Sequence, residues 1–79
     1  MYKEIIGLRI KERRIEVGYT QIDLAAITNI DQGKLSKIEN GKTYPNIEEL
    51  GRIAKQLNIS TDELLGVVIE REPATKKAN

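Results

Sequence analysis

Residues 20–41, TQIDLAAITNIDQGKLSKIENG, decide the fold, because they contain the start and stop signals of two short helices joined by a tight turn. Thr20 is a favourable N-cap, and Asp23 stands three residues later, where it completes a capping box. Asn29 tolerates the left-handed backbone that a sharp turn needs, and Asp31 can cap the next helix. The stretch therefore predicts a helix, a turn at Asn29, and a second helix nearly at right angles to the first.

The second helix of this unit has two different faces. Leu35 and Ile38 lie three residues apart and predict a buried side. The other side is polar, with two cations and several short hydrogen-bonding groups, a composition that suits a DNA groove. The outward residues are Gly33, Lys34, Ser36, Lys37 and Asn40.

A basic amphipathic helix precedes this unit. It spans about residues 3–17 and stops at Gly18, a residue that is common just after a helix end. Ile6, Ile10 and Val17 share one side of the helix and predict its buried face.

Two more helices follow the unit, and each begins with a capping box. Asn46 with Glu49 starts the fourth helix, and Ser60 with Glu63 starts the fifth. The apolar stripe of the fourth helix consists of Ile47, Leu50, Ile53, Ala54 and Leu57. The fifth helix is expected to run through Leu64, Leu65, Val67, Val68 and Ile69.

The fifth helix has more aliphatic side chains than one stripe facing a small core requires. Five of the six residues 64–69 are aliphatic, so some should contact another molecule, and a twofold dimer is the simplest arrangement. We expect residues 1–70 to form one domain that ends in a dimerisation helix, and residues 71–79 to form a flexible polar tail. The predicted dimer contacts are Leu64, Val67, Val68 and Ile69.

The composition excludes several kinds of site. The 79 residues include no cysteine and no histidine, which excludes disulfides, zinc sites built on these residues, and Ser-His or Cys-His catalytic pairs. No metal, cofactor or enzymatic activity is expected. The apolar runs are far shorter than the roughly 20 residues that span a bilayer, and no signal peptide is recognisable, so we expect a cytoplasmic protein without membrane contact.

The charge pattern is only a weak indicator of nucleic-acid binding. The net charge is +1, and residues 1–44 have eight cations against six anions, so the small positive excess lies with the predicted helix-turn-helix half. The solvated faces of an ordinary small helical protein would give the same pattern.

Several spaced motifs together resemble a known family. They are Arg14 and Gly18; Thr20, Gln21, Leu24 and Ala25; Asn29, Ile30 and Asp31; residues 35–41; Pro45; and Ile53, Ala54, Leu57, Ile59, Ser60, Leu64 and Leu65. From about residue 6 to residue 65, the chain resembles the Cro and lambda-repressor type of helix-turn-helix domain, also called the XRE type. The resemblance implies an all-α, five-helix DNA-binding domain in which the second and third helices form the helix-turn-helix.

The resemblance also implies roles for individual residues. Gln21 would pack against phosphate and steady Gln32, while Arg14 and Glu39 would form an internal ion pair between the first helix and the recognition helix. The implied base-reading residues are Gln32, Gly33, Lys34 and Lys37. The implied contacts to the DNA backbone are Thr20, Gln21, Ser36, Asn40 and Lys42.

Two positions, Asn29 and Thr28, depart from the family pattern. Asn29 stands where the family turn favours glycine, and asparagine is an acceptable left-handed residue there. Thr28 stands where an apolar residue usually ends the second helix, and we expect it to weaken a core contact without breaking the fold. Gly33 allows two interpretations: its missing side chain lets the helix sit deeper in the groove, or a first-turn glycine is simply tolerated.

The resemblance implies a prokaryotic or phage transcriptional regulator that binds a palindromic operator in double-stranded DNA as a homodimer. We expect a repressor, because the sequence indicates neither an activating surface nor a pocket for a small-molecule effector. Two alternatives remain open. The domain could chiefly bind a protein partner, as an antitoxin or an adaptor does, or it could be a restriction-modification controller.

Overall fold

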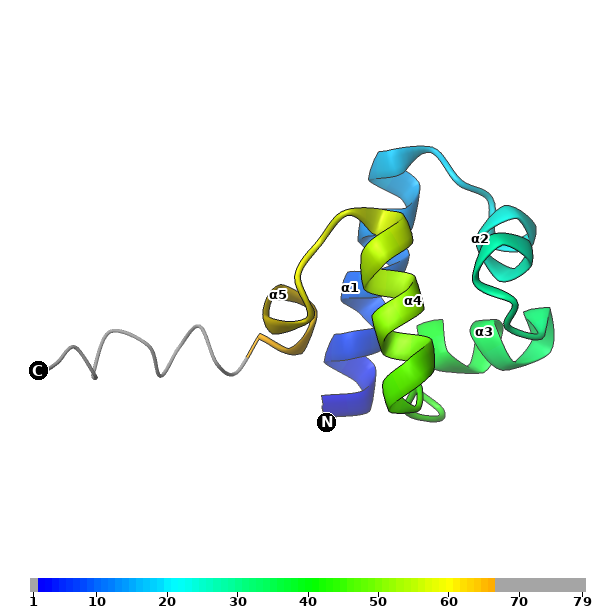
Figure 1. Ribbon diagram of the computed structural model, residues 1–79. Coiled ribbons are helices and arrows are strands. Elements are labelled where there is room, and N and C mark those ends of the chain that lie inside the picture. Colours follow the sequence, from blue (N-terminus) through cyan, green and yellow to red (C-terminus); the bar gives the residue numbers. More distant parts are fainter. Residues whose placement is uncertain (1, 67–79) are drawn as a thin grey trace, which may run out of the picture.

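The computed structural model describes residues 2–66, and this part of the chain forms five helices and no strand (Figure 1). The helices are α1 (Tyr2–Val17), α2 (Gln21–Thr28), α3 (Gln32–Glu39), α4 (Ile47–Leu57) and α5 (Thr61–Leu65). None of these helices is long and apolar enough to cross a membrane. The predicted all-α fold, with α2 and α3 as the helix-turn-helix, is confirmed.

The helix starts lie where the capping residues predict them. Thr20 Oγ1 accepts a hydrogen bond from the Asp23 N–H at 3.0 Å, and the Asp23 carboxylate accepts one from the Thr20 N–H at 3.1 Å. The same exchange opens α4 at Asn46 and α5 at Ser60. Asp31 caps α3 by accepting a hydrogen bond from the Lys34 N–H at 3.1 Å.

The turn between α2 and α3 has the predicted geometry. Asn29 adopts a left-handed backbone with φ 57° and ψ 41°, and its N–H donates to carbonyl groups of the last turn of α2. Ile30, the next residue, is buried in the core. The turn thus redirects the chain and anchors it at the same point.

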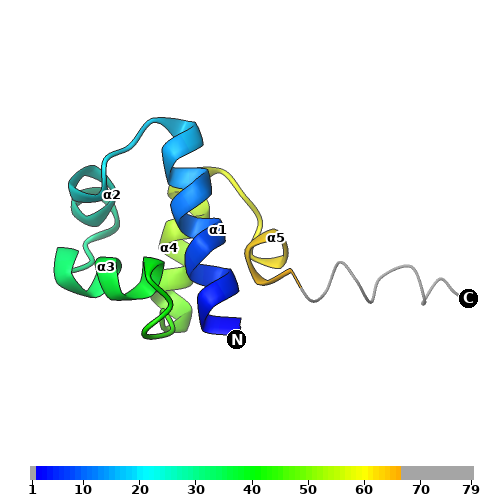
Figure 2. The ribbon, with the colours of Figure 1, turned by 180° about the vertical axis from the view of Figure 1, so that it is seen from behind.

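The helices surround one hydrophobic core. Helices α1 and α4 lie side by side, with α2 and α3 on one flank and α5 on the other (Figures 1 and 2). The core residues come from all five helices and the turn: Ile6, Ile10, Leu24, Ala25, Ile30, Leu35, Ile38, Ile53, Ala54, Leu57 and Leu64.

A glycine sets the closest approach between two helices. A Cβ atom on Gly7 of α1 would overlap the carbonyl oxygen of Ile38 and would lie 2.9 Å from that of Glu39. Since these carbonyls belong to the end of α3, Gly7 lets the backbones of α1 and α3 meet directly.

Two residues that the sequence pattern assigns to buried faces are exposed. Val17 is 40% exposed, because it is the last residue of α1, where the helix projects beyond the core. Ile47 is 89% exposed, because it lies in the first turn of α4 at the edge of the apolar stripe. The buried face of α1 continues instead from Ile6 and Ile10 to Arg14.

The prediction of a long fifth helix is wrong. Helix α5 ends at Leu65, because Gly66 takes a left-handed backbone with φ 77° and its N–H donates to the Asp62 carbonyl at 2.8 Å. Leu64 is fully buried in the core, so its side chain has no surface to offer a second subunit. The other predicted dimer contacts, Val67, Val68 and Ile69, lie outside the described residues, as does the expected tail.

Candidate nucleic-acid interface

Helix α3 has one buried face and one outward face. Leu35, Ile38 and Glu39 are buried. The outward face consists of four exposed residues, Gln32, Gly33, Lys37 and Asn40, and two half-buried ones, Lys34 and Ser36. All the predicted base-reading residues therefore lie on one side of one helix.

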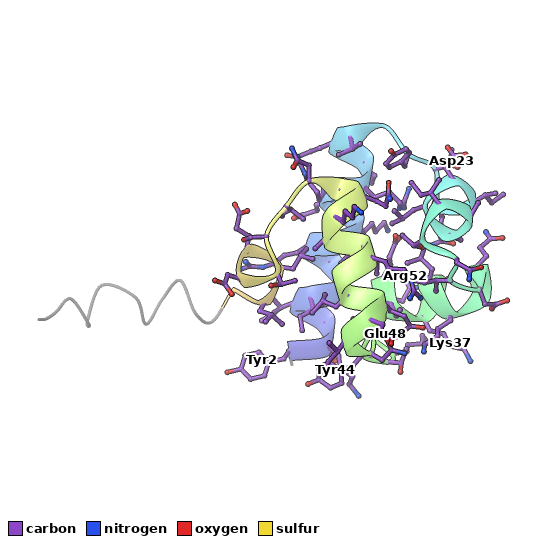
Figure 3. The ribbon with its side chains drawn as sticks, viewed as in Figure 1. Tyr2, Asp23, Lys37, Tyr44, Glu48 and Arg52 are labelled. Carbon is purple, nitrogen blue, oxygen red and sulfur yellow. The ribbon has the colours of Figure 1, made fainter. Side chains whose placement is uncertain are left out.

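Lysines surround a hollow beside this face. The hollow has a volume of about 500 Å³ and is lined by Asp31, Gly33, Lys34, Lys37, Lys42 and Thr43. Figure 3 shows Lys37 on the outer side of α3. Three cations against one carboxylate, that of Asp31, give the lining of this hollow a positive excess, whereas the whole chain is nearly neutral.

A buried network joins α1, α2 and α3. Arg14 Nε lies 2.8 Å from Glu39 Oε2, and Arg14 Nη2 lies 3.0 Å from Glu39 Oε1, so the contact is bidentate. The side chains are 11% and 1% exposed. Gln21 Nε2 donates to Glu39 Oε1 at 3.1 Å. The structure therefore brings Arg14 and Glu39 together, and it directs Gln21 to Glu39, whereas the resemblance implied a contact with Gln32.

The candidate backbone contacts lie at the start of α2 and at the end of α3. Thr20 is exposed at the N-cap of α2, where its hydroxyl already accepts a hydrogen bond. Asn40 ends α3, and its Nδ2 donates to Ser36 Oγ at 3.4 Å. Lys42 is exposed in the following loop, with its N–H bonded to the Lys37 carbonyl at 2.8 Å. Asn40 and Lys42 therefore lie at the C-terminal end of α3, and Gln21, the residue after Thr20, contacts Glu39 at the same end.

Glu49 contacts the recognition helix, which the sequence did not predict. Its Oε1 accepts the Asn46 N–H at 2.9 Å, and its Oε2 lies 2.9 Å from the ammonium of Lys34. Burial alone would raise the pKa of the Glu49 carboxyl, but the hydrogen bonds from Asn46 and Lys34 outweigh it and keep that pKa below its usual range. Lys34 is thus already ion-paired within the protein.

Arg52 makes a second contact between α4 and the helix-turn-helix. Its Nε donates to the Thr28 carbonyl at 2.7 Å, and Figure 3 shows Arg52 on the side of α4 that faces α2 and α3. Thr28 is itself fully buried, and its hydroxyl donates to the Leu24 carbonyl at 2.6 Å. The hydroxyl is therefore satisfied inside the core, where an unpaired one would cost stability.

Gly33 has open space around it. A Cβ atom there would meet a single atom within 4 Å, the Asp31 carboxylate oxygen at 3.0 Å. No packing within residues 2–66 therefore requires a glycine, apart from this contact with the helix cap.

Comparisons with known proteins agree with this geometry. The sequence model of the helix-turn-helix family matches residues 10–64. The chain is 39% identical over 61 residues to the HTH-type transcriptional regulator ImmR of Bacillus subtilis (strain 168), which covers 77% of this chain and 48% of ImmR. It is 38% identical over 69 residues to the HTH-type transcriptional regulator SinR of the same organism, which covers 86% of this chain and 62% of SinR. The chain thus spans about half to three fifths of these relatives.

Solved structures are also similar. The crystal structure of SinR, a master regulator of biofilm formation, in complex with DNA has a TM-score of 0.71 and 39% identity, covering 76% of this chain and 97% of that one. The restriction-modification controller protein C.AhdI from Aeromonas hydrophila has a TM-score of 0.74 and 26% identity, covering 78% of this chain and 94% of that one. Because the family match extends over more than half of the sequence, this chain belongs to the helix-turn-helix family.

Proposed function

We propose that this protein is a sequence-specific transcriptional regulator that inserts α3 into the major groove of double-stranded DNA and acts as a repressor. The observation that carries the proposal is the outward face of α3. It is polar and mostly exposed, it includes Lys34 and Lys37 and lies beside Lys42, and its opposite face is buried in the core. A helix fixed in this way can present the same side chains to successive base pairs. The function is one of binding, and catalysis forms no part of it.

The similarity to the DNA complex of SinR supports the proposal. That SinR chain is matched over 97% of its length, so the likeness includes the whole helix-turn-helix rather than a single motif. A transcriptional regulator binds chromosomal DNA, so we propose that the protein acts in the cytoplasm.

We assign the DNA contacts to two groups. Gln32 would read adenine through its amide, which can donate and accept at once, and Gly33 and Lys37 would lie along the same base edges. Thr20, Gln21, Ser36, Asn40 and Lys42 would contact the sugar-phosphate backbone and fix the register of α3. Lys34 belongs to neither group, since Glu49 already binds its ammonium.

We also propose that the regulator binds as a homodimer. In the sequence, the apolar run Val67, Val68, Ile69 follows Gly66, the residue that ends α5. An apolar hollow of about 320 Å³ opens near the end of α5 and is lined by Tyr2, Ile6, Tyr44 and Leu65. A second subunit that covers such a surface removes it from water, and twofold symmetry then requires an inverted repeat in the DNA.

A selection of random duplexes against the purified protein tests the proposal. We expect enrichment of an inverted repeat with half-sites about one helical turn apart, and affinity that falls steeply as salt rises. If no sequence is enriched at any salt concentration, the protein is not a sequence-specific DNA binder, and a protein partner becomes the better explanation.

Two single variants then separate base contacts from backbone contacts. Gln32→Ala should relax the preference at one or two base positions, at a cost of about 1–3 kcal/mol on the preferred sequence. Lys42→Ala should weaken binding to all sequences alike and leave the preference unchanged. The reverse pattern would show that the two roles have been exchanged.

A further inference from the structure

The Lys34–Glu49 ion pair has unequal partners. The side chain of Lys34 is 40% exposed, whereas that of Glu49 is 10% exposed. Glu49 is also fixed from its own helix, because its Oε1 accepts the Asn46 N–H in the capping box. The carboxylate therefore cannot follow the lysine if the lysine moves.

Leaving this pair would cost the protein a buried interaction. If Lys34 turned towards a phosphate, Glu49 Oε2 would remain largely buried without the ammonium that now contacts it. Lys37 and Lys42 face no such cost. Both are exposed, and among residues 2–66 neither ammonium forms an ion pair.

We propose that Glu49 keeps Lys34 away from DNA, so that Lys34 positions α3 against α4 and contributes no phosphate or base contact. This inference rests on the proposed DNA-binding function, and it identifies Lys34 as a positioning residue and Glu49 as the group that withdraws its charge from the interface. The cations left to contact DNA at this hollow are Lys37 and Lys42.

The salt dependence of DNA binding measures the effect directly. Each phosphate that a cation neutralises contributes about 0.9 to the slope of log affinity against log salt concentration. The probes are the duplex that the selection enriches and a scrambled duplex of the same length, each titrated over a fourfold range of salt.

Three variants test the proposal. Lys34→Met should leave the slope unchanged, because the wild-type lysine contacts no phosphate. Glu49→Gln keeps an acceptor for the Asn46 N–H but removes the negative charge that holds the Lys34 ammonium. The slope should therefore steepen by about 0.9 per bound subunit, which is about 3.5-fold in affinity over the fourfold salt range. The double variant Lys34→Met with Glu49→Gln should return to the wild-type slope.

Matched controls exclude a general charge effect. Glu48→Gln makes the same charge change one residue earlier in the first turn of α4. The Glu48 side chain, however, is 87% exposed, and its Oε1 lies 3.9 Å from Nη1 of Arg52. Its slope should equal that of the wild type. Lys37→Met should make the slope shallower by about 0.9 per subunit, since Lys37 is proposed to contact DNA.

The possible results are distinct. A shallower slope for Lys34→Met, or an unchanged slope for Glu49→Gln, would overturn the inference while leaving DNA binding in place. A steeper slope for Glu48→Gln equal to that for Glu49→Gln would overturn it too, because charge alone would then explain both. If the wild-type protein binds neither duplex, the proposed function fails, and the inference fails with it.

Discussion

The buried ion pair of Arg14 and Glu39 links the first helix to the recognition helix. We expect Glu39→Ala to lower the free energy of unfolding by about 3 kcal/mol, because the Arg14 guanidinium would stay buried without its partner. Urea denaturation followed by circular dichroism measures the change. The exposed pair of Arg13 and Glu16 provides the control, and Glu16→Ala should cost less than about 1 kcal/mol. Equal costs for the two variants would contradict the structural role of Glu39.

Gly7 tests the direct contact between α1 and α3. We expect Gly7→Ala to lower the free energy of unfolding by at least about 2 kcal/mol, because the new methyl group would overlap the Ile38 carbonyl oxygen. Gly51→Ala is the matched control. Gly51 is exposed in α4 with no atom near its absent Cβ, so alanine there should raise stability by up to about 1 kcal/mol. A tolerated Gly7→Ala would mean that the two backbones can separate freely.

Sequence spacing could predict residues whose roles depend on neighbours within one helical turn. Thr20 with Asp23 is such a case, since both partners belong to one capping box. Gly7 and Glu49 act through atoms on other helices, and no spacing rule connects them to α3. Arg14 and Glu39 lie 25 residues apart, and the sequence indicated their contact solely through the family resemblance.

At the scale of helices, the start of α4 has two functions. Glu49 caps its own helix through the Asn46 N–H and binds α3 through Lys34. One carboxylate therefore stabilises a helix end and the packing of two helices. The contact with Lys34 depends on its charge, whereas a neutral acceptor can still cap the helix.

The charge of Glu49 should make stability pH-dependent. Its pKa in the folded protein lies below the ordinary value of 4.5. As pH falls through this range, the unfolded chain therefore binds more protons than the folded protein does. The contribution is complete above about pH 4.5 and is lost as pH falls through the folded pKa. We expect the free energy of unfolding to fall less steeply between about pH 5 and pH 3 in Glu49→Gln than in the wild type.

Urea denaturation across this pH range gives the comparison, with Glu48→Gln as the matched variant. The Glu48 side chain is 87% exposed, so its removal should leave the pH profile close to that of the wild type. Parallel profiles for the wild type and Glu49→Gln would show that the buried carboxylate does not contribute in this way.

Helix starts were more predictable than helix ends and faces. Asn46 and Ser60 predict the starts of α4 and α5, because a capping box involves residues only three positions apart in the sequence. Gly66 ends α5 before the aliphatic residues that follow it in the sequence. A glycine inside an apolar pattern does not by itself show whether its backbone conformation is helical or left-handed. Ile47 fits the apolar stripe of α4 yet is exposed, because a stripe says nothing of how far the neighbouring helices extend.

At the scale of the whole molecule, the proposed homodimer is the main prediction. Sedimentation velocity should show a dimer at tens of micromolar protein, with one dimer bound per inverted repeat. Val68→Glu should shift the equilibrium towards monomer, because a charge in an apolar contact is costly to bury. Glu63→Gln, an exposed change in α5, should leave the dimer intact. A wild-type protein that sediments only as a monomer and binds DNA one to one would contradict the dimer.

Two side chains on the outward face of α3, those of Gln32 and Lys37, contribute little to the packing of the domain. Among residues 2–66, the side chains of Gln32 and Lys37 form no hydrogen bond or ion pair, while α3 is fixed from behind by Glu39 and Glu49. The two side chains proposed to read bases therefore differ from those that hold α3 in the scaffold. Divergence at these two positions can give such a scaffold a new target without a loss of stability, which is the property that lets one small fold serve many regulatory circuits.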